Sequence, residues 1–168
     1  MEKLVIAWDL DGTLIDSTHR VKFKEDGEFD LEEWIKSSED KDSVFKDTLL
    51  PLSNVYFEFA KSGFTQICVT ARNMTDIDFE YLSSNGLYFD MILHRGDSLE
   101  LDEELKSRKL QNFLKAKGRI PFMAFDDKEE NLKIFDNYGF RTFQAIYMNE
   151  KLKKDSFSDI KDVKPSLF

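Results

Sequence analysis

Residues 3–13 read KLVIAWDLDGT, and this stretch decides the fold of the chain. Lys3–Trp8 is almost continuously apolar, which is typical of a central strand that is covered on both faces of a parallel sheet. Asp9 and Asp11 follow at once, and side chains two residues apart in an extended chain point the same way. Gly12 then permits a sharp turn. We therefore expect both acids to face a pocket at the carboxyl end of the first strand.

Short apolar runs alternate with helix-length amphipathic runs along the rest of the chain, which is typical of α/β proteins with a parallel sheet. The further strands are expected at residues 66–70, 91–93, 122–125 and 142–146. The helices are expected at about 44–61, 75–84, 103–117 and 128–138. A glycine follows each helix, as a left-handed C-cap favours: Gly63, Gly86, Gly118 and Gly139. The sequence predicts a three-layer, Rossmann-like α/β fold with helices on both faces of the sheet.

An acidic segment at about 16–42 interrupts this alternation. Its part 25–42 carries nine acids against Lys36 and Lys41, in a chain of 168 residues whose net charge is −9. Residues 31–35 predict a short helix with Trp34 turned inward. We interpret the segment as a short flap, too small for a full cap domain. The expected organisation is one domain over 1–149 that includes the flap, followed by a polar C-terminal tail over 150–168.

Composition excludes several classes of protein. The negative net charge argues against a broad basic surface that coats a nucleic-acid duplex. The single cysteine, Cys68, excludes a disulfide framework, and no signal-peptide pattern precedes the first strand, so we expect a reducing, cytoplasmic setting. No apolar run is long enough to span a membrane. No sequence pattern identifies a stable protein partner.

Asp126 and Asp127 form a second acidic motif after the expected strand FMAF. Together with Asp9 and Asp11 at another strand end, they are typical of a site for Mg²⁺, which prefers a few carboxylates, water and phosphate oxygens. The alternative is that Asp127 caps the next helix, with Glu130 completing a capping box. Since only one acid has to cap, the two interpretations are compatible. Taken alone, the motif Asp9-Leu10-Asp11-Gly12 is also explained by a simple Asp-Gly loop without a metal.

Two further motifs suit an anionic ligand. The hydroxyl of Thr70 and the backbone N–H of Ala71 suit one phosphoryl oxygen, and the guanidinium of Arg72 suits another. Lys106 lies in the first turn of an expected helix, where a cation opposes the helix dipole and is explained by an anionic partner. Lys109, one turn later on the same face, is the alternative. Taken singly, a strand-end threonine is more often structural, and a lysine that is simply solvated explains Lys106 or Lys109 equally well.

The four motifs in this order resemble the haloacid dehalogenase (HAD) superfamily of phosphotransferases, over residues 4 to about 148. Within it, the chain is most similar to the 3′-phosphatase domain of bacteriophage polynucleotide kinase. That likeness rests on RGD at 95–97, Asp102 with Lys106, FDD at 125–127 and FRTFQ at 140–144. The resemblance implies a HAD-like fold with a minimal or no cap domain and, for a phage protein, the host cytoplasm as its location.

The resemblance also implies a mechanism. Asp9 would attack phosphorus to form a phosphoaspartate, and Asp11 would protonate the leaving oxygen and then activate water. Mg²⁺ would be bound by Asp9, the Asp11 carbonyl and the pair Asp126 and Asp127. The equatorial phosphoryl oxygens would be held by Thr70 and Lys106. The residues expected to contact substrate around them are Thr13, Ala71, Arg72 and Arg95.

The substrate expected from this resemblance is the 3′-phosphate of a polynucleotide end, or a nucleotide, because a short flap leaves the site open to bulky molecules. The flap cations His19, Arg20, Lys22 and Lys24 are candidates for backbone contacts, although solvated charges explain the lysines equally well. No GxxxxGK[ST] phosphate loop accompanies the site. One alternative is a small-molecule phosphatase such as a 5′-nucleotidase. A receiver-like signalling module is disfavoured, because in receivers the acid pair ends the first strand.

Overall fold

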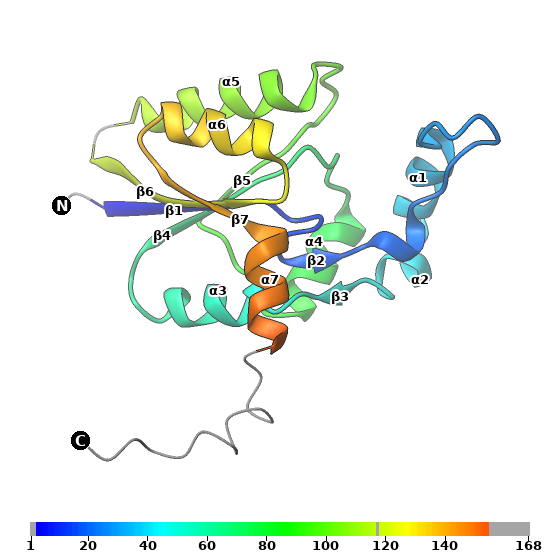
Figure 1. Cartoon of the computed structure of the whole chain (residues 1–168), viewed down its shortest axis with the longest axis horizontal. Coiled ribbons are helices and arrows are strands. Elements are labelled where there is room, and N and C mark those ends of the chain that lie inside the picture. The colour runs from blue at the N-terminus through cyan, green and yellow to red at the C-terminus, as the bar shows by residue number, and fades with distance from the viewer. Residues whose placement is uncertain (1–2, 117, 155–168) are drawn as a thin grey trace, which may run out of the picture.

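A computed structural model describes residues 3–116 and 118–154. Five parallel strands form one sheet in the order β5-β4-β1-β6-β7 (Figure 1). β1 (Lys3–Trp8) is central, between β4 (Thr65–Val69) and β6 (Arg119–Asp126). The edge strands are β5 (Met91–Leu93) and β7 (Arg141–Gln144). The predicted α/β fold with a parallel sheet is confirmed.

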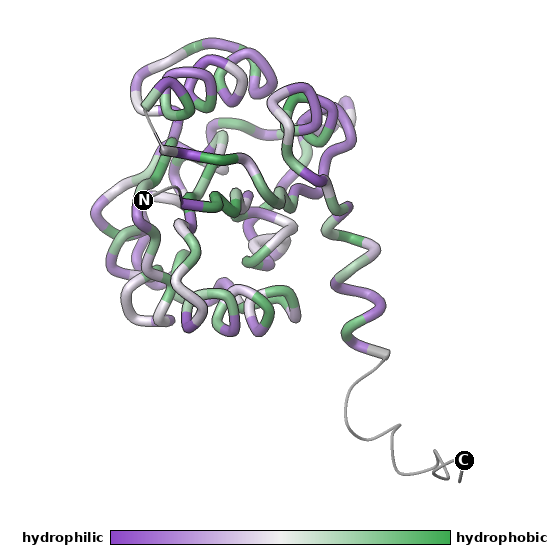
Figure 2. Tube along the Cα trace, turned by 90° about the vertical axis from the view of Figure 1, so that its left-hand side faces the viewer, coloured by the Kyte–Doolittle hydropathy of each residue, from purple (hydrophilic) through white to green (hydrophobic). Residues whose placement is uncertain are grey.

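Helices cover both faces of this sheet. On one face lie α3 (Leu52–Ala60), α4 (Asp76–Ser84) and α7 (Ala145–Lys154). On the other lie α5 (Asp102–Leu114) and α6 (Glu129–Asn137). Figure 2 shows long hydrophobic stretches in the central strands and mixed hydropathy along the helices. The layers therefore follow the amphipathic pattern of the sequence.

Residues of β1 alternate between the two cores. Ile6 and Trp8 pack into the core beneath α3 and α4, whereas Val5 and Ala7 pack into the core beneath α5 and α6. All four are fully buried. Because the crossover helices change face at β1, the carboxyl ends of β1 and its neighbours form the switch point where α/β folds bind ligands.

The helix expected at about 44–61 is wrong in its first half. A short helix α2 (Lys41–Val44) precedes β3 (Thr48–Leu49), and α3 begins only at Leu52. Pro51 explains the break, because a proline inside a helix removes a backbone hydrogen bond. The backbone of β3 pairs instead with β2 (Ile15–Asp16) in an antiparallel ladder.

The C-terminal strand is shorter than expected. β7 ends at Gln144, and α7 extends through Lys154, so residues 150–154 of the predicted tail are helical. Buried Asn149 fixes this helix: its Oδ1 accepts from the Leu52 N–H at 2.8 Å, and its Nδ2 donates to the Thr13 carbonyl at 3.0 Å. Residues 155–168 of the predicted tail lie outside the described residues.

Residues 17–47, which we call the flap, project beyond the carboxyl edge of the sheet (Figure 1). The β2–β3 ladder joins the two ends of the flap. The flap contains the 3₁₀ helix η1 (Thr18–Arg20), α1 (Leu31–Ser38) and α2. The expected short helix is confirmed, and its Trp34 is half-buried. Within residues 3–116 and 118–154, no helix is long and apolar enough to cross a membrane.

Candidate active site

Three carboxylates meet where β1 and β6 end. One carboxylate oxygen from each of Asp9, Asp126 and Asp127 lies within 4.8 Å of the others. Asp9 follows β1 and Asp126 ends β6, and these two strands are paired in parallel, so their ends lie at one edge of the sheet. We call these three acids together with Lys106 the acidic cluster.

Lys106 reaches the acidic cluster from the first turns of α5. Its Nζ donates to Asp9 Oδ1 at 2.7 Å and to Asp126 Oδ2 at 2.6 Å, and its side chain is 3% exposed. Lys109 is only half-buried and makes neither contact. Of the two candidate lysines, Lys106 is therefore the one that lies among the carboxylates.

The side chain of Asp126, not that of Asp127, accepts a backbone hydrogen bond at the start of α6. The N-cap residue is Lys128, whose side chain makes no cap hydrogen bond, so the predicted capping box of Asp127 and Glu130 is wrong. Asp126 Oδ1 accepts from the Lys128 N–H at 2.9 Å and from Asn131 Nδ2 at 3.0 Å. These bonds leave the Asp127 carboxylate free to face the cluster.

Charge within the acidic cluster is unbalanced. Burial, helped by the nearby carboxylates of Asp126 and Asp127, raises the pKa of Asp9 to about 8, although Lys106 opposes the shift. Burial and Asp126 likewise raise the pKa of Asp127 to about 6. Burial alone would lower the pKa of Lys106, but Asp9 and Asp126 raise it above its ordinary value. One cation does not neutralise three carboxylates, so the cluster favours additional positive charge.

The donor set of the acidic cluster fits a hard divalent cation such as Mg²⁺. All three acids offer oxygen, the ligand atom that Mg²⁺ prefers. Metal binding requires deprotonated ligands, and the raised pKa values of Asp9 and Asp127 disfavour that form without a cation. Gly12 leaves room beside them: its φ is +76°, and a Cβ there would lie 2.7 Å from Asp127 Oδ2. Gly12 thus allows both the turn after β1 and the close approach of the Asp127 side chain.

A second ionic group lies beside the acidic cluster, and we call it the arginine network: Arg20, Arg72, Asp11, Asp47 and Asp78. Arg72 donates from Nε and Nη2 to the two oxygens of Asp11, at 3.0 and 2.5 Å. Its Nη1 donates to Asp78 at 2.7 Å, and its Nη2 lies 3.5 Å from Asp47. Arg20 donates from Nε and Nη2 to Asp47, at 2.9 and 2.7 Å. The network joins the flap to Asp11.

Asp11 is held as a carboxylate by this network. Burial alone would raise its pKa, but the charge and hydrogen bonds of Arg72, with a 2.6 Å bond from Ser17 Oγ, hold the pKa of Asp11 below its ordinary value. Asp9 and Asp11 thus engage different partners, whereas the sequence predicted one shared pocket. The physical reason is that β1 ends at Trp8, so the alternation of an extended strand does not continue to Asp11.

The remaining predicted residues are distributed around these two groups. Buried Thr13 donates from Oγ1 to Asp9 Oδ2 at 3.3 Å, and buried Thr70 accepts the Arg72 N–H at 3.1 Å. Arg95 donates to the Ala71 carbonyl at 2.9 Å and pairs with Asp102. The structure therefore brings Thr13 to Asp9 but binds the guanidiniums of Arg72 and Arg95 to groups of the protein itself.

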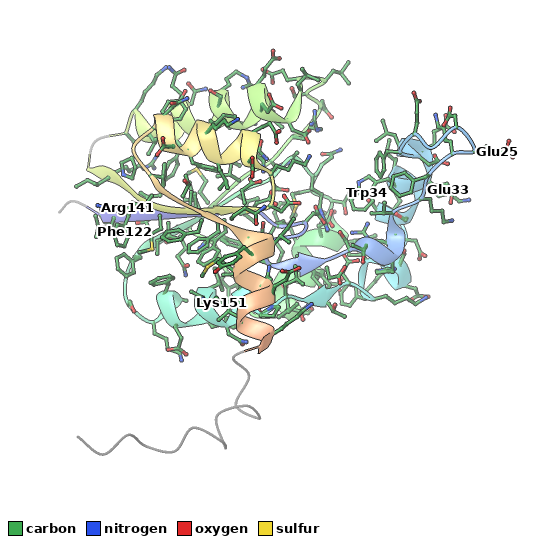
Figure 3. The ribbon with its side chains drawn as sticks, viewed as in Figure 1. Glu25, Glu33, Trp34, Phe122, Arg141 and Lys151 are labelled. Carbon is green, nitrogen blue, oxygen red and sulfur yellow. The ribbon has the colours of Figure 1, made fainter. Side chains whose placement is uncertain are left out.

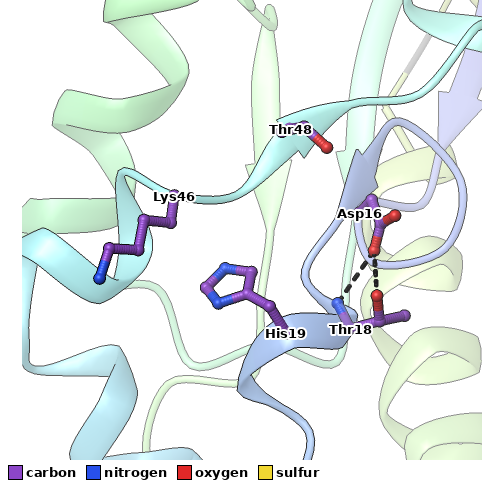
Figure 4. A pocket seen from close by; sticks show the side chains of 5 residues that line it. All are labelled: Asp16, Thr18, His19, Lys46 and Thr48. Carbon is purple, nitrogen blue, oxygen red and sulfur yellow. Dashed lines mark hydrogen bonds between the residues drawn. The ribbon is translucent and has the colours of Figure 1, made fainter.

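The flap cations are also engaged within the protein. Arg20 is 2% exposed, so the prediction that it contacts a nucleic-acid backbone is wrong. His19 Nε2 lies 2.8 Å from Asp47 Oδ1, and Lys22 pairs with Glu33 at 2.7 Å. A cavity of about 340 Å³ opens beside His19 at the base of the flap (Figure 4). It is lined by Asp16, Thr18, His19, Lys46 and Thr48, none of which belongs to the acidic cluster.

Sequence reasoning missed four residues that support these groups: Ser17, Asp47, Asp78 and Asn131. Asp78 carries a local signal, because it forms a capping box with Thr75 at the start of α4. Nothing local indicates that its carboxylate also binds Arg72. Asp47 and Asn131 reach their partners only through the tertiary fold, and no sequence pattern marks them.

Comparisons with known proteins show which family the chain belongs to. The family model described as bacteriophage T5 5′-deoxynucleotidase matches residues 1–98. The 5′-deoxynucleotidase of Escherichia phage T5 is 30% identical over 174 residues, covering 88% of this chain and 69% of that protein. This chain belongs to the bacteriophage T5 5′-deoxynucleotidase family. It is a phosphoric monoester hydrolase.

Solved structures establish that this family member has the HAD fold. A haloacid dehalogenase-like hydrolase from Streptococcus pneumoniae matches with a TM-score of 0.56 and 14% identity, over 84% of each chain. A chain in the Pnkp1/Rnl/Hen1 RNA repair complex matches with a TM-score of 0.63 and 19% identity, over 85% of this chain. This chain spans only 42% of that repair protein. The predicted HAD-like fold is confirmed.

Proposed function

We propose that this chain removes the phosphate from deoxynucleoside 5′-monophosphates, with Mg²⁺, through a phosphoaspartate formed on Asp9. The observation that carries the proposal is the acidic cluster with Lys106, in a member of the 5′-deoxynucleotidase family. The family relationship favours a nucleotide over the polynucleotide 3′ end. The 3′ end stays a prediction that the same experiment tests.

In the proposed first step, an Asp9 oxygen forms a bond to phosphorus as the bond from phosphorus to the 5′ oxygen breaks, and Asp11 gives that oxygen a proton. Asp11 is ionised in the substrate-free protein because Arg72 lowers its pKa. Negative phosphoryl oxygens near Asp11 oppose the effect of Arg72 and favour proton uptake. The acid step therefore requires a proton that arrives with or after substrate.

In the proposed second step, water attacks phosphorus, Asp11 takes its proton and the bond from Asp9 to phosphorus breaks. Ionised Asp11 suits this base role directly. Lys106 balances part of the charge on the phosphoryl oxygens, together with the Thr70 hydroxyl and the backbone N–H of Ala71. Asp9, Asp126 and Asp127, with the Asp11 carbonyl, would hold Mg²⁺, which would supply further charge neutralisation between nucleophile and phosphate.

Phosphate release tests the proposal. We would compare deoxynucleoside 5′-monophosphates, ribonucleoside 5′-monophosphates and a 3′-phosphorylated oligonucleotide, each with Mg²⁺ and after chelation. The expected result is metal-dependent release that is fastest from the deoxynucleotides, absent in Asp9→Asn and retained in Asp136→Asn, a control at an exposed acid of α6. Release from the oligonucleotide alone would instead support the 3′-phosphatase prediction.

The intermediate has its own test. In Asp11→Asn, a substrate with a good leaving group such as p-nitrophenyl phosphate bypasses the need for an acid, while the second step still lacks its base. We expect a protein whose mass rises by one phosphoryl group, with the group located on Asp9. Failure to detect this adduct while Asp11→Asn turns over at the wild-type rate would contradict the proposed role of Asp11.

A further inference from the structure

Trp34 lies at the junction of the flap and the arginine network. The guanidinium carbon of Arg20 is 4.5 Å from the centroid of its ring, and that of Arg72 is 6.0 Å away. Figure 3 shows Trp34 on the side of α1 that faces the rest of the molecule, whereas Glu33 and Glu25 lie on the opposite side. The flap thus brings one large aromatic ring to the residues around Asp11.

This position corresponds to the leaving-group side of the proposed reaction. Lys106 and the metal-binding carboxylates lie around Asp9, where the phosphate must be held. Asp11, which protonates the leaving oxygen in the proposed mechanism, is bound to Arg72. Because the nucleoside departs from the phosphorus on the side of the acid, its sugar and base extend toward Asp11, Arg72 and the ring beside them.

The Trp34 ring is held in place but is not fully covered. Arg20 is fixed by Asp47 and by a 3.1 Å bond to Ser38 Oγ, so the cation under the ring does not move freely. The side chain remains half-buried, and its indole N–H makes no hydrogen bond to any residue that the structure describes. Trp8, by contrast, is fully buried and donates to Gln66.

We propose that Trp34 stacks against the nucleobase of the nucleoside monophosphate, so that the flap selects nucleotides over phosphomonoesters that lack a base. Stacking on an aromatic ring tolerates every base, because each base has a π face. The inference rests on the proposed nucleotidase function and adds to it a specificity-determining residue. The competing role for Trp34 is to cover Arg20 and so keep the arginine network, and with it Asp11, in place.

Kinetics of Trp34→Leu and Trp34→Phe separate these roles. With 2′-deoxyadenosine 5′-monophosphate, we expect Trp34→Leu to raise KM about 10- to 100-fold with kcat unchanged, because stacking contributes equally before and in the transition state. With deoxyribose 5-phosphate, which has no base, KM should change less than about threefold. Trp34→Phe should keep most of the wild-type KM.

A matched control lies on α7. Tyr147 is 60% exposed, and its ring is faced by a lysine, Lys151, at 5.8 Å, so Tyr147→Leu removes a similar aromatic and cation pair from a helix outside the flap. This variant should leave KM and kcat unchanged for both substrates. A kcat that falls equally for both substrates in Trp34→Leu would assign Trp34 the structural role and overturn the proposal, as would an unchanged KM for the nucleotide.

Fluorescence gives a readout that does not depend on turnover. The chain has two tryptophans, and Trp8 is fully buried, so quenching by a stacked base reports on Trp34. In Asp9→Asn, 2′-deoxyadenosine 5′-monophosphate should quench the emission, whereas deoxyribose 5-phosphate should not. Trp34→Phe in the same background should lose the signal. If the wild-type enzyme hydrolyses the nucleotide but the nucleotide does not quench Asp9→Asn, this inference alone is overturned. If the wild-type enzyme hydrolyses no nucleotide, the proposed function is overturned.

Discussion

The acidic cluster and the arginine network lie side by side and are built from the same kinds of group, yet they differ in balance. The cluster sets three carboxylates against Lys106, and the pKa values of Asp9 and Asp127 are raised. The network sets three carboxylates against two guanidiniums, and the pKa of Asp11 is lowered. A buried group whose charges are nearly balanced acts as a scaffold, whereas one with a larger excess of negative charge is suited to receive a cation.

The two groups also use different cations, arginine in the network and lysine in the cluster, and these suit different roles. Arginine forms several hydrogen bonds in a fixed plane, so Arg72 can hold Asp11 and Asp78 at the same time. Lysine is a compact charge on a flexible stem, so Lys106 can shift between Asp9, Asp126 and an arriving phosphoryl oxygen. In the proposed mechanism, the network therefore fixes the positions of Asp11 and the flap, while the contacts of Lys106 in the cluster change during turnover.

Removal of Arg72 should have the largest effect on stability. Arg72→Ala leaves the buried carboxylate of Asp78 and the half-buried carboxylate of Asp11 without their arginine, and breaking a buried pair in this way costs about 3–5 kcal/mol. Urea unfolding should therefore show a much lower midpoint. Arg108→Ala, which breaks the exposed pair with Glu100, is the control and should leave the midpoint unchanged. Equal midpoints for the two variants would show that the network does not act as a scaffold.

The two groups should respond to pH in opposite directions. A raised pKa means that the folded state keeps a proton that the unfolded state releases, so Asp9 destabilises the metal-free protein as pH rises from about 4 to about 8. The fall is at most about 1.4 kcal/mol per pH unit for one carboxyl group. The stabilisation by Asp11 instead is lost as pH falls below about 4, through its lowered pKa.

Chelator-treated protein unfolded in urea at several pH values would measure this slope, with Asp9→Asn as the variant that should flatten it between pH 6 and 8. Mg²⁺ should stabilise the wild type increasingly with pH over the same range, because binding requires deprotonated ligands. A metal-free stability that rises steadily from pH 5 to 8 would contradict the imbalance assigned to the cluster.

Asp127→Asn removes a charge from the acidic cluster and should nevertheless make the metal-free protein more stable. Its pKa is raised to about 6 by burial and by Asp126, so the amide removes repulsion above that pH. At pH 8 and without metal, the variant should gain about 1 kcal/mol, a figure kept small because the carboxylate is partly exposed to solvent screening. Thermal unfolding should also show that Mg²⁺ no longer stabilises it. Asp136→Asn, at an exposed acid of α6, should show neither effect.

Periodicity and strand-end motifs predicted much of this arrangement. β1 and β5 have the predicted bounds, and parallel strands necessarily bring Asp9 and Asp126 to one edge. The arginine network could not be predicted, because its pairs join residues up to 61 positions apart and none has a local pattern. The cap of α6 was assigned to the wrong acid: Asp126 accepts the Lys128 N–H two residues along the chain, and Lys106 and Asn131 also bind its carboxylate.

The smallest expected effect is that of a substitution at Gly12, which lies in the motif after β1 and approaches Asp127 of the acidic cluster. Gly12→Ala places a Cβ 2.7 Å from Asp127 Oδ2 and forces a left-handed φ of +76° on alanine. Gly27→Ala, in the flap, has nearly the same φ of +85° but nothing within 4 Å of its Cβ. Both should lose about 1 kcal/mol of stability from backbone strain. Only Gly12→Ala should also bind Mg²⁺ about tenfold more weakly in calorimetry, because Asp127 must move. Equal affinities in the two variants would mean that Asp127 adapts freely and that the glycine serves the turn alone.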